Sequence, residues 1–336
     1  PVQDVLQDIA MSRSDDGQDL FGFKSVGELT AKVAPKRPSR IKQRLIESSV
    51  AIEEDDPRTL AFQHSVFCQT GMPYRDPGSA VREWERRQGM ASLLIEAGRA
   101  QHPETGEWLK LGLPFGPKPR LILAYLNAQA LRTGSPVIEV EDSLTAFVKR
   151  IGLASKGRNV RLIKDQLGRL SAATIRLGVA NGDRSLNVNA HIVSAFDLWL
   201  AKDERQRVLW PSTVQLSLDY FESLQRHAVP LDERAVSALS HSAMGLDIYA
   251  WLAQRLHRVD PCKPQFIPWK AIKDQFGWHY KAMFKFRQVF SQTLDMVLTQ
   301  YRGARIELDG KGMTLRNSPP PVKGRMAVVP PLPGRS

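Results

Sequence analysis

The clearest pattern of apolar and polar positions lies between His279 and Tyr301, where apolar residues recur at the spacing of an amphipathic α-helix. One side of the helical wheel carries Met283, Phe286, Phe290, Leu294, Val297 and Tyr301. The other side carries Lys281, Lys285, Gln288 and Gln292. The pattern predicts a helix with one face in a core and a strip of long donors outside. Such donors suit phosphate oxygens and base edges, and a plain solvated face has the same composition.

The flanking sequence completes a larger unit. Residues Pro268–Phe276 read as a short helix that Gly277 interrupts, and an Arg-Gly pair ends the long helix. Two short apolar runs follow, Ala304–Leu308 and Met313–Arg316, separated by an Asp-Gly turn that is typical of a β-hairpin. A short helix, a turn, a long helix and a basic hairpin together predict a winged helix.

A second copy of this order lies upstream. Its helix and strand patterns are Leu121–Leu131, Val137–Val140, Ser143–Ile151, Gly157–Ala172, Ala173–Val179 and Ser185–Ile192, the last two around an Asn-Gly hairpin tip. A third strand, Arg207–Leu216, is expected to join this sheet. Ile122, Ala124 and Leu126 match Ile248, Ala250 and Leu252, and the interval from the shared Ala to the turn Gly is 28 positions in one copy and 27 in the other. Repetition of a whole supersecondary unit favours two tandem winged helices.

The recognition helix expected in the first copy, Gly157–Ala172, also has a cationic side. Val160, Ile163, Leu167 and Leu170 form its apolar side. The cations expected to face outward in this copy are Arg158, Arg161, Lys164 and Arg169, with Arg184 at the tip of the wing. Both copies therefore present basic residues at the positions that a DNA-binding winged helix uses.

The predicted fold class is α+β: two tandem winged-helix domains, each a helix-turn-helix with a β-hairpin wing, plus a small N-terminal β-hairpin extension. That extension pairs Met90–Ala97 with Glu107–Leu111. The predicted domains are a flexible N-terminal arm (1–57), the first winged helix with its N-terminal hairpin (58–218), the second winged helix (219–317) and a Pro-rich disordered tail (318–336). Within the arm, 41–52 has the pattern of a short helix.

The charge distribution points to an anionic partner. The formal net charge is +12 over 336 residues. Residues 118–200 carry 12 Lys and Arg against 6 Asp and Glu, and residues 260–336 carry 13 against 5. The excess therefore lies on the two helix-turn-helix units, as a protein that binds duplex DNA requires.

The sequence gives no support for catalysis, a metal or a cofactor. Two cysteines, Cys68 and Cys262, are too far apart in sequence to suggest a ligand pair or a disulfide framework. The seven histidines form no HEXXH or HxH motif, and the chain has no phosphate-binding loop, no GxGxxG and no GxSxG elbow. We expect no enzyme activity, no metal and no cofactor. No apolar run suits a membrane span or a signal peptide, so we expect a cytoplasmic protein.

Several long segments resemble plasmid-encoded RepA-type replication initiators, the tandem winged-helix proteins that bind iterons. The segments are GLPFGPKPRLILAYLNAQALRTGSPVIEVEDSLTAFVKRIG, LIKDQLGRLSAATIRLG and VLWPSTVQLSLDYFESLQRHAVPLDERAVSALSHSAMGLDIYAWLAQRLHRV. The resemblance covers roughly residues 67–318. It implies binding to direct repeats (iterons) in double-stranded plasmid origin DNA, help in melting the adjacent DNA, copy-number control, and recruitment of the host initiator ATPase and replicative helicase. It also implies a homodimer in equilibrium with the monomer, with the dimer repressing the initiator's own promoter.

Carried onto this chain, the resemblance assigns roles to faces of the molecule. The base readers are expected among Trp278, His279, Lys281, Lys285, Gln288 and Gln292. Phosphate contacts are expected from Arg305, Lys311 and Arg316 at the second wing, and from the cations of the first copy. Two alternatives stay open: a winged-helix transcriptional repressor without initiator activity, which the same fold allows, and a scaffold whose basic faces are merely solvated.

Overall fold

The computed structural model describes residues 39–102, 105–140, 143–181, 184–190, 192–195 and 213–322, and for 180–181, 184–190 and 193–195 it describes the backbone alone. The described elements from Arg40 onward belong to one compact unit. One cluster of buried apolar side chains runs through both copies of the repeated order, from Leu45 to Leu315. The predicted third strand of the first copy and the Pro-rich tail lie partly outside the described residues, at 207–212 and 323–336.

The helices of the described part are α3 (Arg40–Glu54), α4 (Ser65–Thr70), α5 (Pro117–Thr133), α6 (Leu144–Arg150), α7 (Gly157–Ala172), α8 (Leu218–His227), α9 (Glu233–Ala238), α10 (Ala243–Arg255), the 3-10 helix η1 (Leu256–Arg258), α11 (Trp269–Phe276) and α12 (Met283–Gln300). The strands are β1 (Leu60–His64), β2 (Glu83–Gln88), β3 (Ala91–Glu96), β4 (Arg99–Gln101), β5 (Trp108–Lys110), β6 (Val137–Glu139), β7 (Thr174–Asn181), β8 (Arg184–Ala190), β9 (Val193–Ala195), β10 (Thr213–Leu216), β11 (Ala228–Asp232), β12 (Gln265–Pro268), β13 (Ile306–Leu308) and β14 (Gly312–Leu315). The mixture of helices and sheets agrees with the predicted α+β class.

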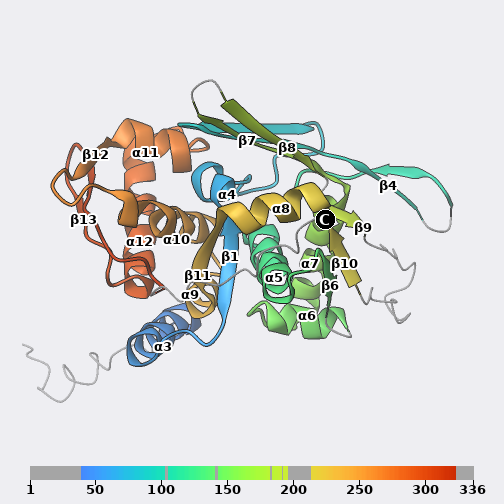
Figure 1. The fold of residues 1–336 in the computed structure, drawn as a ribbon, viewed down its shortest axis with the longest axis horizontal. Helices are drawn as coiled ribbons and strands as arrows, with labels where there is room; N and C mark the ends of the chain where they lie inside the picture. Colours follow the sequence, from blue (N-terminus) through green and yellow to red (C-terminus); the bar gives the residue numbers. More distant parts are fainter. Residues whose placement is uncertain are drawn as a thin grey trace, which may run out of the picture. The chain divides into compact units, whose positions relative to one another are not determined.

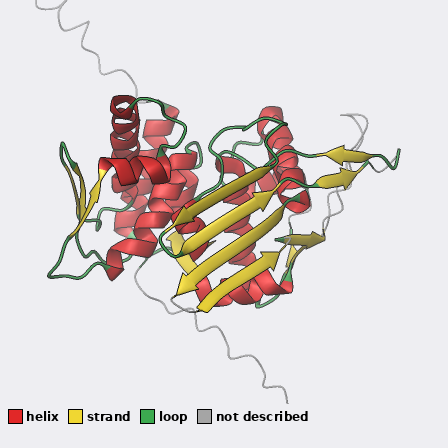
Figure 2. Cartoon of the chain, turned by 90° about the horizontal axis from the view of Figure 1, so that it is seen from above, coloured by secondary structure: helices red, strands yellow, loops and turns green. Residues whose placement is uncertain are grey.

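The largest sheet has four antiparallel strands in the order β2-β3-β7-β8. Figure 2 shows it face-on, with helices behind it, and Figure 1 shows it edge-on above α4 and α8. Leu93 and Ile95 of β3, and Ile175 and Leu177 of β7, are buried because alternate positions of these strands face the helices. The sheet therefore joins the hairpin of the first copy to two strands that precede it in the chain.

The second copy follows the predicted order closely. Helix α10 is capped by Ser242, whose hydroxyl accepts from the backbone nitrogen of Gly245 at 3.0 Å. It is followed by β12, α11, α12 and the β13–β14 hairpin, and β14 lies between β12 and β13 in an antiparallel sheet. Figure 1 shows this sheet, α11 and α12 at one side of the molecule.

The first copy has the predicted helices and a different sheet. Ser143 caps α6 by accepting from the nitrogen of Ala146 at 3.1 Å, and α7 spans the predicted Gly157–Ala172. Strand β6 pairs with β10, and β10 pairs with β9, whereas the β7–β8 hairpin pairs with β3. The expectation that the strand ending at Leu216 would join the hairpin sheet was wrong, because that strand lies between β6 and β9 instead.

Two further expectations need correction. The predicted pairing of 90–97 with 107–111 was wrong, because β3 lies between β2 and β7 and β5 pairs with β4. The arm was expected to extend to residue 57, but α3 is folded onto α9 and α12. Leu45 is buried there, and Gln300 of α12 donates to its carbonyl oxygen at 2.8 Å. Burial of one apolar face of α3 explains why this segment is part of the fold.

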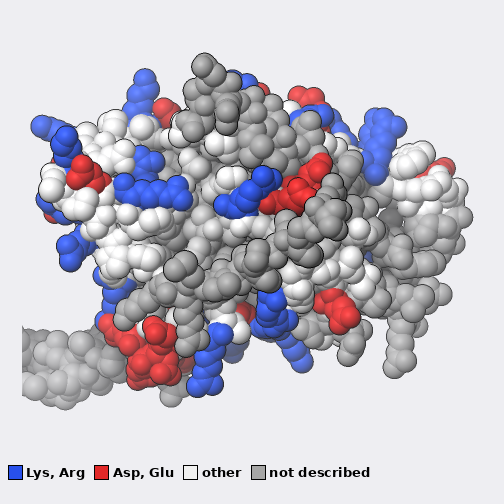
Figure 3. Space-filling model, in the orientation of Figure 1, with Lys and Arg blue, Asp and Glu red and all other residues white. Residues whose placement is uncertain are grey.

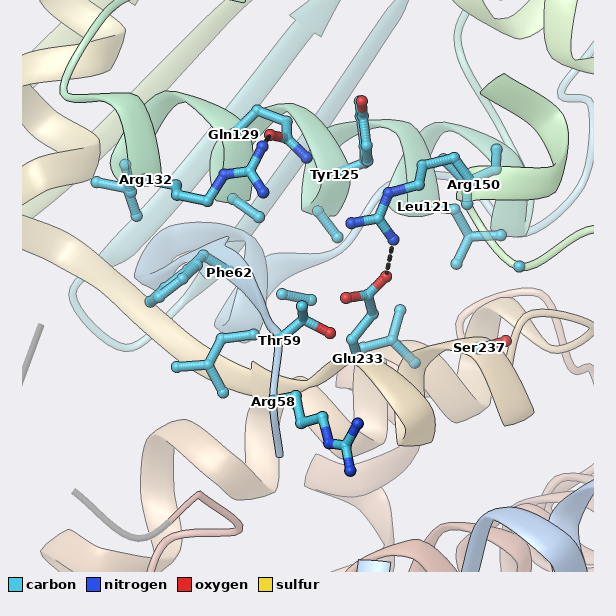
Figure 4. Close-up of a pocket in the computed structure, with 18 residues that line it drawn as sticks. Arg58, Thr59, Phe62, Leu121, Tyr125, Gln129, Arg132, Arg150, Glu233 and Ser237 are labelled. Atoms are coloured by element: carbon cyan, nitrogen blue, oxygen red, sulfur yellow. Dashed lines mark hydrogen bonds and ion pairs between the residues drawn. The ribbon is translucent and has the colours of Figure 1, made fainter. Parts of the chain in front are cut away.

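An apolar cavity of about 320 Å³ lies between β1, α5, α6 and α9 (Figure 4). Leu121, Ala124 and Phe62 supply much of its apolar lining. Arg150 of α6 and Glu233 of α9 form an ion pair of 2.8 Å across it, which Figure 4 marks with a dashed line. The cavity is a gap in the packing where these elements meet. The Arg150 and Glu233 charges within it neutralise each other.

The turn between α11 and α12 depends on the absence of a side chain at Gly277. A Cβ atom there would lie 2.3 Å from the buried Phe286 ring. Gly277→Ala is therefore expected to lower the free energy of unfolding by about 1–3 kcal/mol, because the ring must shift within a packed core. Gly310→Ala, between β13 and β14, is the control, since no atom lies within 4 Å of that Cβ. Chemical denaturation measures both, and equal effects would contradict the prediction.

Candidate nucleic-acid interface

The turn before α12 is more extended than the sequence pattern suggested. The nitrogen of Tyr280 donates to the carbonyl oxygen of Gly277 at 2.8 Å, and the helix begins at Met283 rather than at His279. The predicted core positions Phe286, Phe290, Leu294, Val297 and Tyr301 are buried, whereas Met283 is partly exposed. The rings of Phe276 and Phe290 lie 5.7 Å apart, so the buried side of α12 packs directly on α11. This packing leaves the opposite side of α12 outside the core.

The predicted polar strip is exposed. Lys281 lies in the turn, and Lys285, Gln288 and Gln292 follow on successive turns of α12. The ammonium of Lys285 donates to Oε1 of Gln288 at 3.0 Å, so the two side chains lie together on the helix surface. The strip therefore presents ammonium and amide groups that can donate to phosphates or to base edges.

Trp278 and His279 pack against residues that precede the first copy. The Trp278 ring packs edge-on against Trp84 of β2 at 4.6 Å, and the His279 ring packs against Tyr74 at 5.6 Å. Burial, with Arg75 nearby, lowers the pKa of His279. Its Nδ1 atom is buried and has no hydrogen-bond partner among the described residues. The structure thus gives His279 a packing role, while Trp278 keeps about 37% of its surface exposed.

The β13–β14 hairpin of the second copy is joined to α12 by an arginine that was not predicted. Arg287 donates to the carbonyl oxygen of Gly310 and lies over the Trp269 ring at 4.8 Å. Backbone donors from Gly312 and Lys311 lower the pKa of the Asp309 carboxyl at the tip. These contacts hold the hairpin in place beside the start of α12.

The three predicted wing cations differ in their surroundings. Lys311 and Arg305 are exposed, and the backbone nitrogen of Arg305 donates to the Ser318 hydroxyl at 2.9 Å. Arg316 is paired with Glu307 across the hairpin at 2.8 Å. Both side chains are largely exposed, so their ion pair is weak, and Arg316 can exchange Glu307 for another anion.

The cations of the first copy do not form a single strip. Arg158 and Arg161 are exposed near the start of α7, and Lys164 is half-buried. Arg169 is turned inward: it bonds to Asp165 at 3.1 Å and lies over the Phe115 ring at 5.0 Å. The expectation that Arg169 would face outward was wrong because nearby acceptors and an aromatic ring hold it. The side chain of Arg184 lies outside the described residues, and only its pairing with Asn181 at the hairpin end is described.

A cationic cluster near α7 was missed in the sequence. Burial lowers the pKa of Lys118 at the start of α5, and so do the neighbouring charges of Arg158 and Arg44. Arg44 of α3 donates to the carbonyl oxygen of Ala238 at 3.0 Å. No sequence spacing relates residues 44, 118 and 158, so only the fold brings them together. An anion bound nearby relieves repulsion between like charges.

Figure 3 shows how the charges lie on one face of the molecule. Lys and Arg side chains gather over the part formed by α11, β12 and β13, whereas Asp and Glu gather near α3. The second copy therefore presents a cationic surface beside the exposed strip of α12. This surface suits a polyanion more than a small acidic molecule.

The described residues contain neither a cluster of metal ligands nor a helix suited to span a membrane. No group of three or more His, Cys, Asp or Glu side chains within them is arranged to hold a metal ion. Among the same residues, no helix combines the length and apolarity that crossing a membrane requires.

The chain matches the model of a known family and is similar to solved structures. Residues 113–271 match the model of a family described as plasmid encoded RepA protein. A crystal structure of selenomethionine derivatives of domains 2 and 3 of RctB is similar with a TM-score of 0.45 and 10% identity, covering 75% of this chain and 98% of that one. A second structure of RctB domains 2–3 has a TM-score of 0.41 and 10% identity, covering 79% and 94%. No protein of curated function matches the chain.

Proposed function

Because the chain belongs, through residues 113–271, to the family of plasmid-encoded RepA proteins, we propose that it is a replication initiator that binds repeated sequences (iterons) at a plasmid origin. The observation that carries the proposal is the exposed strip of Lys281, Lys285, Gln288 and Gln292 beside a hairpin with cations. The action is binding and assembly, without catalysis and without a cofactor.

In this proposal each copy acts as a winged helix. For the second copy, the element order from α10 to β14 and the central place of β14 in its sheet support that assignment. Helix α12 enters the major groove, because a helix of this kind matches the groove in width and its first turns reach base edges. Lys311 and Arg305 hold the phosphates beside it, and Arg316 joins them on exchanging Glu307 for a phosphate.

The first copy is assigned mainly to the DNA backbone. Arg158 and Arg161 are exposed at the start of α7, and Lys118 and Arg44 add charge beside Arg158. Each phosphate that is neutralised releases counterions, so the logarithm of the affinity falls with the logarithm of salt concentration by about 0.9 per contact. Binding by both copies therefore depends more steeply on salt than binding by one.

The wider role follows the family. Bound at the repeats, the protein helps to melt the adjacent DNA and recruits the host initiator ATPase and the replicative helicase in the bacterial cytoplasm. A homodimer in equilibrium with the monomer represses the initiator's own promoter. The second candidate is a winged-helix transcriptional repressor, since an exposed α12 and its wing support duplex binding whether or not replication follows.

Replacement of Lys281 and Lys285 by alanine tests the interface. The double variant is expected to bind duplex DNA carrying the plasmid's repeats at least tenfold more weakly, and the salt slope is expected to fall by about two, because two phosphate or base contacts are lost. Titration at several salt concentrations measures both quantities.

The matched control is Arg99→Ala with Lys110→Ala, which removes the same charge from the paired strands β4 and β5. Its affinity and slope are expected to stay within twofold of the unaltered protein. Equal affinity for the α12 double variant and the unaltered protein would remove this helix from the interface.

A replication assay separates the two candidates. The gene and its flanking repeats are placed on a plasmid that has no other origin, and a reporter records activity of the gene's promoter. An initiator maintains the plasmid, and the Lys281→Ala, Lys285→Ala double variant loses it. If the unaltered protein fails to maintain the plasmid and still silences the promoter, it is a repressor.

A further inference from the structure

Phe284 is an apolar side chain at the centre of the proposed DNA-binding face. It is the second residue of α12 and remains 75% exposed, the largest fraction among the exposed large apolar side chains of the described residues. The buried side of the helix begins only at Phe286. Phe284 therefore adds nothing to the core, and its exposure needs another explanation.

The helical repeat places Phe284 next to the polar strip. Gln288 lies one turn further along the same face, and Lys285 is the adjacent residue. Arg287 is turned away, since it lies over Trp269 and bonds to the wing. The helix carries a single carboxylate, Asp295, about three turns beyond Phe284. An aromatic ring is thus surrounded by ammonium and amide donors.

This combination argues against a protein partner on the face. The centre of a protein interface is depleted in lysine, because burying an ammonium without an anion is unfavourable. A duplex removes that difficulty, since phosphates lie on either side of the groove and base edges form its floor. The apolar group that the major groove offers is the C5 methyl of thymine, which side chains such as phenylalanine contact directly.

We propose that Phe284 contacts the C5 methyl group of a thymine in the major groove and makes this position of the site specific for an A·T pair. The inference rests on the proposed function, because it requires α12 in the groove. Lys285 and Gln288 position the ring by binding the flanking phosphates and the neighbouring base. The contact recognises a methyl group, so 5-methylcytosine is a chemical mimic of the preferred base.

The test removes only the methyl group. Preferred duplexes are selected from a random pool with the whole chain, and each thymine is then replaced in turn by uracil. At one position, uracil is expected to weaken binding about fourfold, the equivalent of about 0.8 kcal/mol for one methyl group. Phe284→Ala is expected to bind the thymine and uracil duplexes equally. At the same position, 5-methylcytosine is expected to exceed cytosine in affinity for the unaltered protein alone.

The controls distinguish this inference from the proposed function. Leu218→Ala removes another exposed apolar side chain, and it should leave the thymine preference unchanged. Thermal unfolding confirms that both variants are folded. If the protein binds selected DNA and every thymine-to-uracil ratio is the same with and without Phe284, the thymine contact is wrong and the proposed function stands. If the protein selects no duplex, both fall.

Discussion

Replacement of Arg120 by methionine is expected to lower the free energy of unfolding by about 3–5 kcal/mol, because it leaves a buried carboxylate without its partner. Nε and Nη2 of Arg120 bind the two oxygens of Asp247 at 2.6 and 2.8 Å. The two residues are 3% and 8% exposed. The guanidinium also donates to the carbonyl oxygens of Met72 and Gly116, each at 2.7 Å. Methionine fills a similar volume and satisfies none of these acceptors.

Two comparisons separate loss of the buried pair from loss of charge. Arg87→Ala removes an exposed arginine that bonds to Glu85 at 2.8 Å, and it should change stability by less than about 1 kcal/mol. Arg120→Met combined with Asp247→Leu should recover part of the loss, because an apolar pair replaces an uncompensated charge. Chemical denaturation measures all three. A loss below about 1 kcal/mol for Arg120→Met would contradict the prediction.

The pair also bears on function, because it joins equivalent helices of the two copies. Arg120 lies in α5 and Asp247 in α10. Further contacts link the second copy to β2 and α4: Arg86 donates to the carbonyl oxygen of Asp274, and Gln275 donates to that of Gln69 at 2.9 Å. The position of α11 relative to the first copy is therefore set by the buried pair together with polar contacts near the end of α11. For the proposed DNA binding, this fixed relation means that no linker has to be ordered when both copies contact one duplex.

Local order was predictable from this sequence, whereas strand partners were not. The helical repeat located α7 and the buried face of α12, and the Asp-Gly turn located the β13–β14 hairpin, because each signal lies within a few neighbouring residues. The partners of β3 are β2 and β7, and β7 is about 80 positions away along the chain. An alternating apolar pattern marks a strand and its buried face, and it contains no information about which strand lies beside it.

The same reasoning explains the errors in the site. Periodicity extended the long helix back to His279, but α12 begins at Met283, and Trp278 and His279 lie in the preceding turn, where they pack against Trp84 and Tyr74. Arg169 has the right spacing for an outward-facing cation, yet Asp76, 93 positions away, also lies 3.5 Å from its guanidinium. A helical wheel shows which side of a helix is polar, and the neighbours that occupy that side come from the rest of the fold.

Acid is expected to destabilise the protein through His64, because this side chain is buried in its neutral form. Burial lowers the pKa of His64 to about 3, and the nearby His227 adds to the effect. The backbone nitrogen of Val66 donates to Nδ1 at 3.2 Å, so Nε2 carries the proton and donates to the Ser223 hydroxyl at 3.0 Å. The ring thus caps α4 and ties it to α8. Protonation at Nδ1 removes the cap and places a charge in the core.

The sign of the pH effect on stability follows from the pKa of His64 in the folded and unfolded states. In the unfolded chain His64 binds a proton below about pH 6.5, whereas the folded state does not until about pH 3. Stability is therefore complete above pH 6.5 and falls as the pH decreases, by about 2 kcal/mol between pH 7 and pH 5. His64→Asn keeps an oxygen that can accept from Val66, so it retains the cap without a titrating group. Denaturation at pH 7 and pH 5 should show the unaltered protein losing about 2 kcal/mol more than the variant. Because His227 also titrates and remains in both proteins, equal losses would assign the acid sensitivity to other groups and leave His64 without this role.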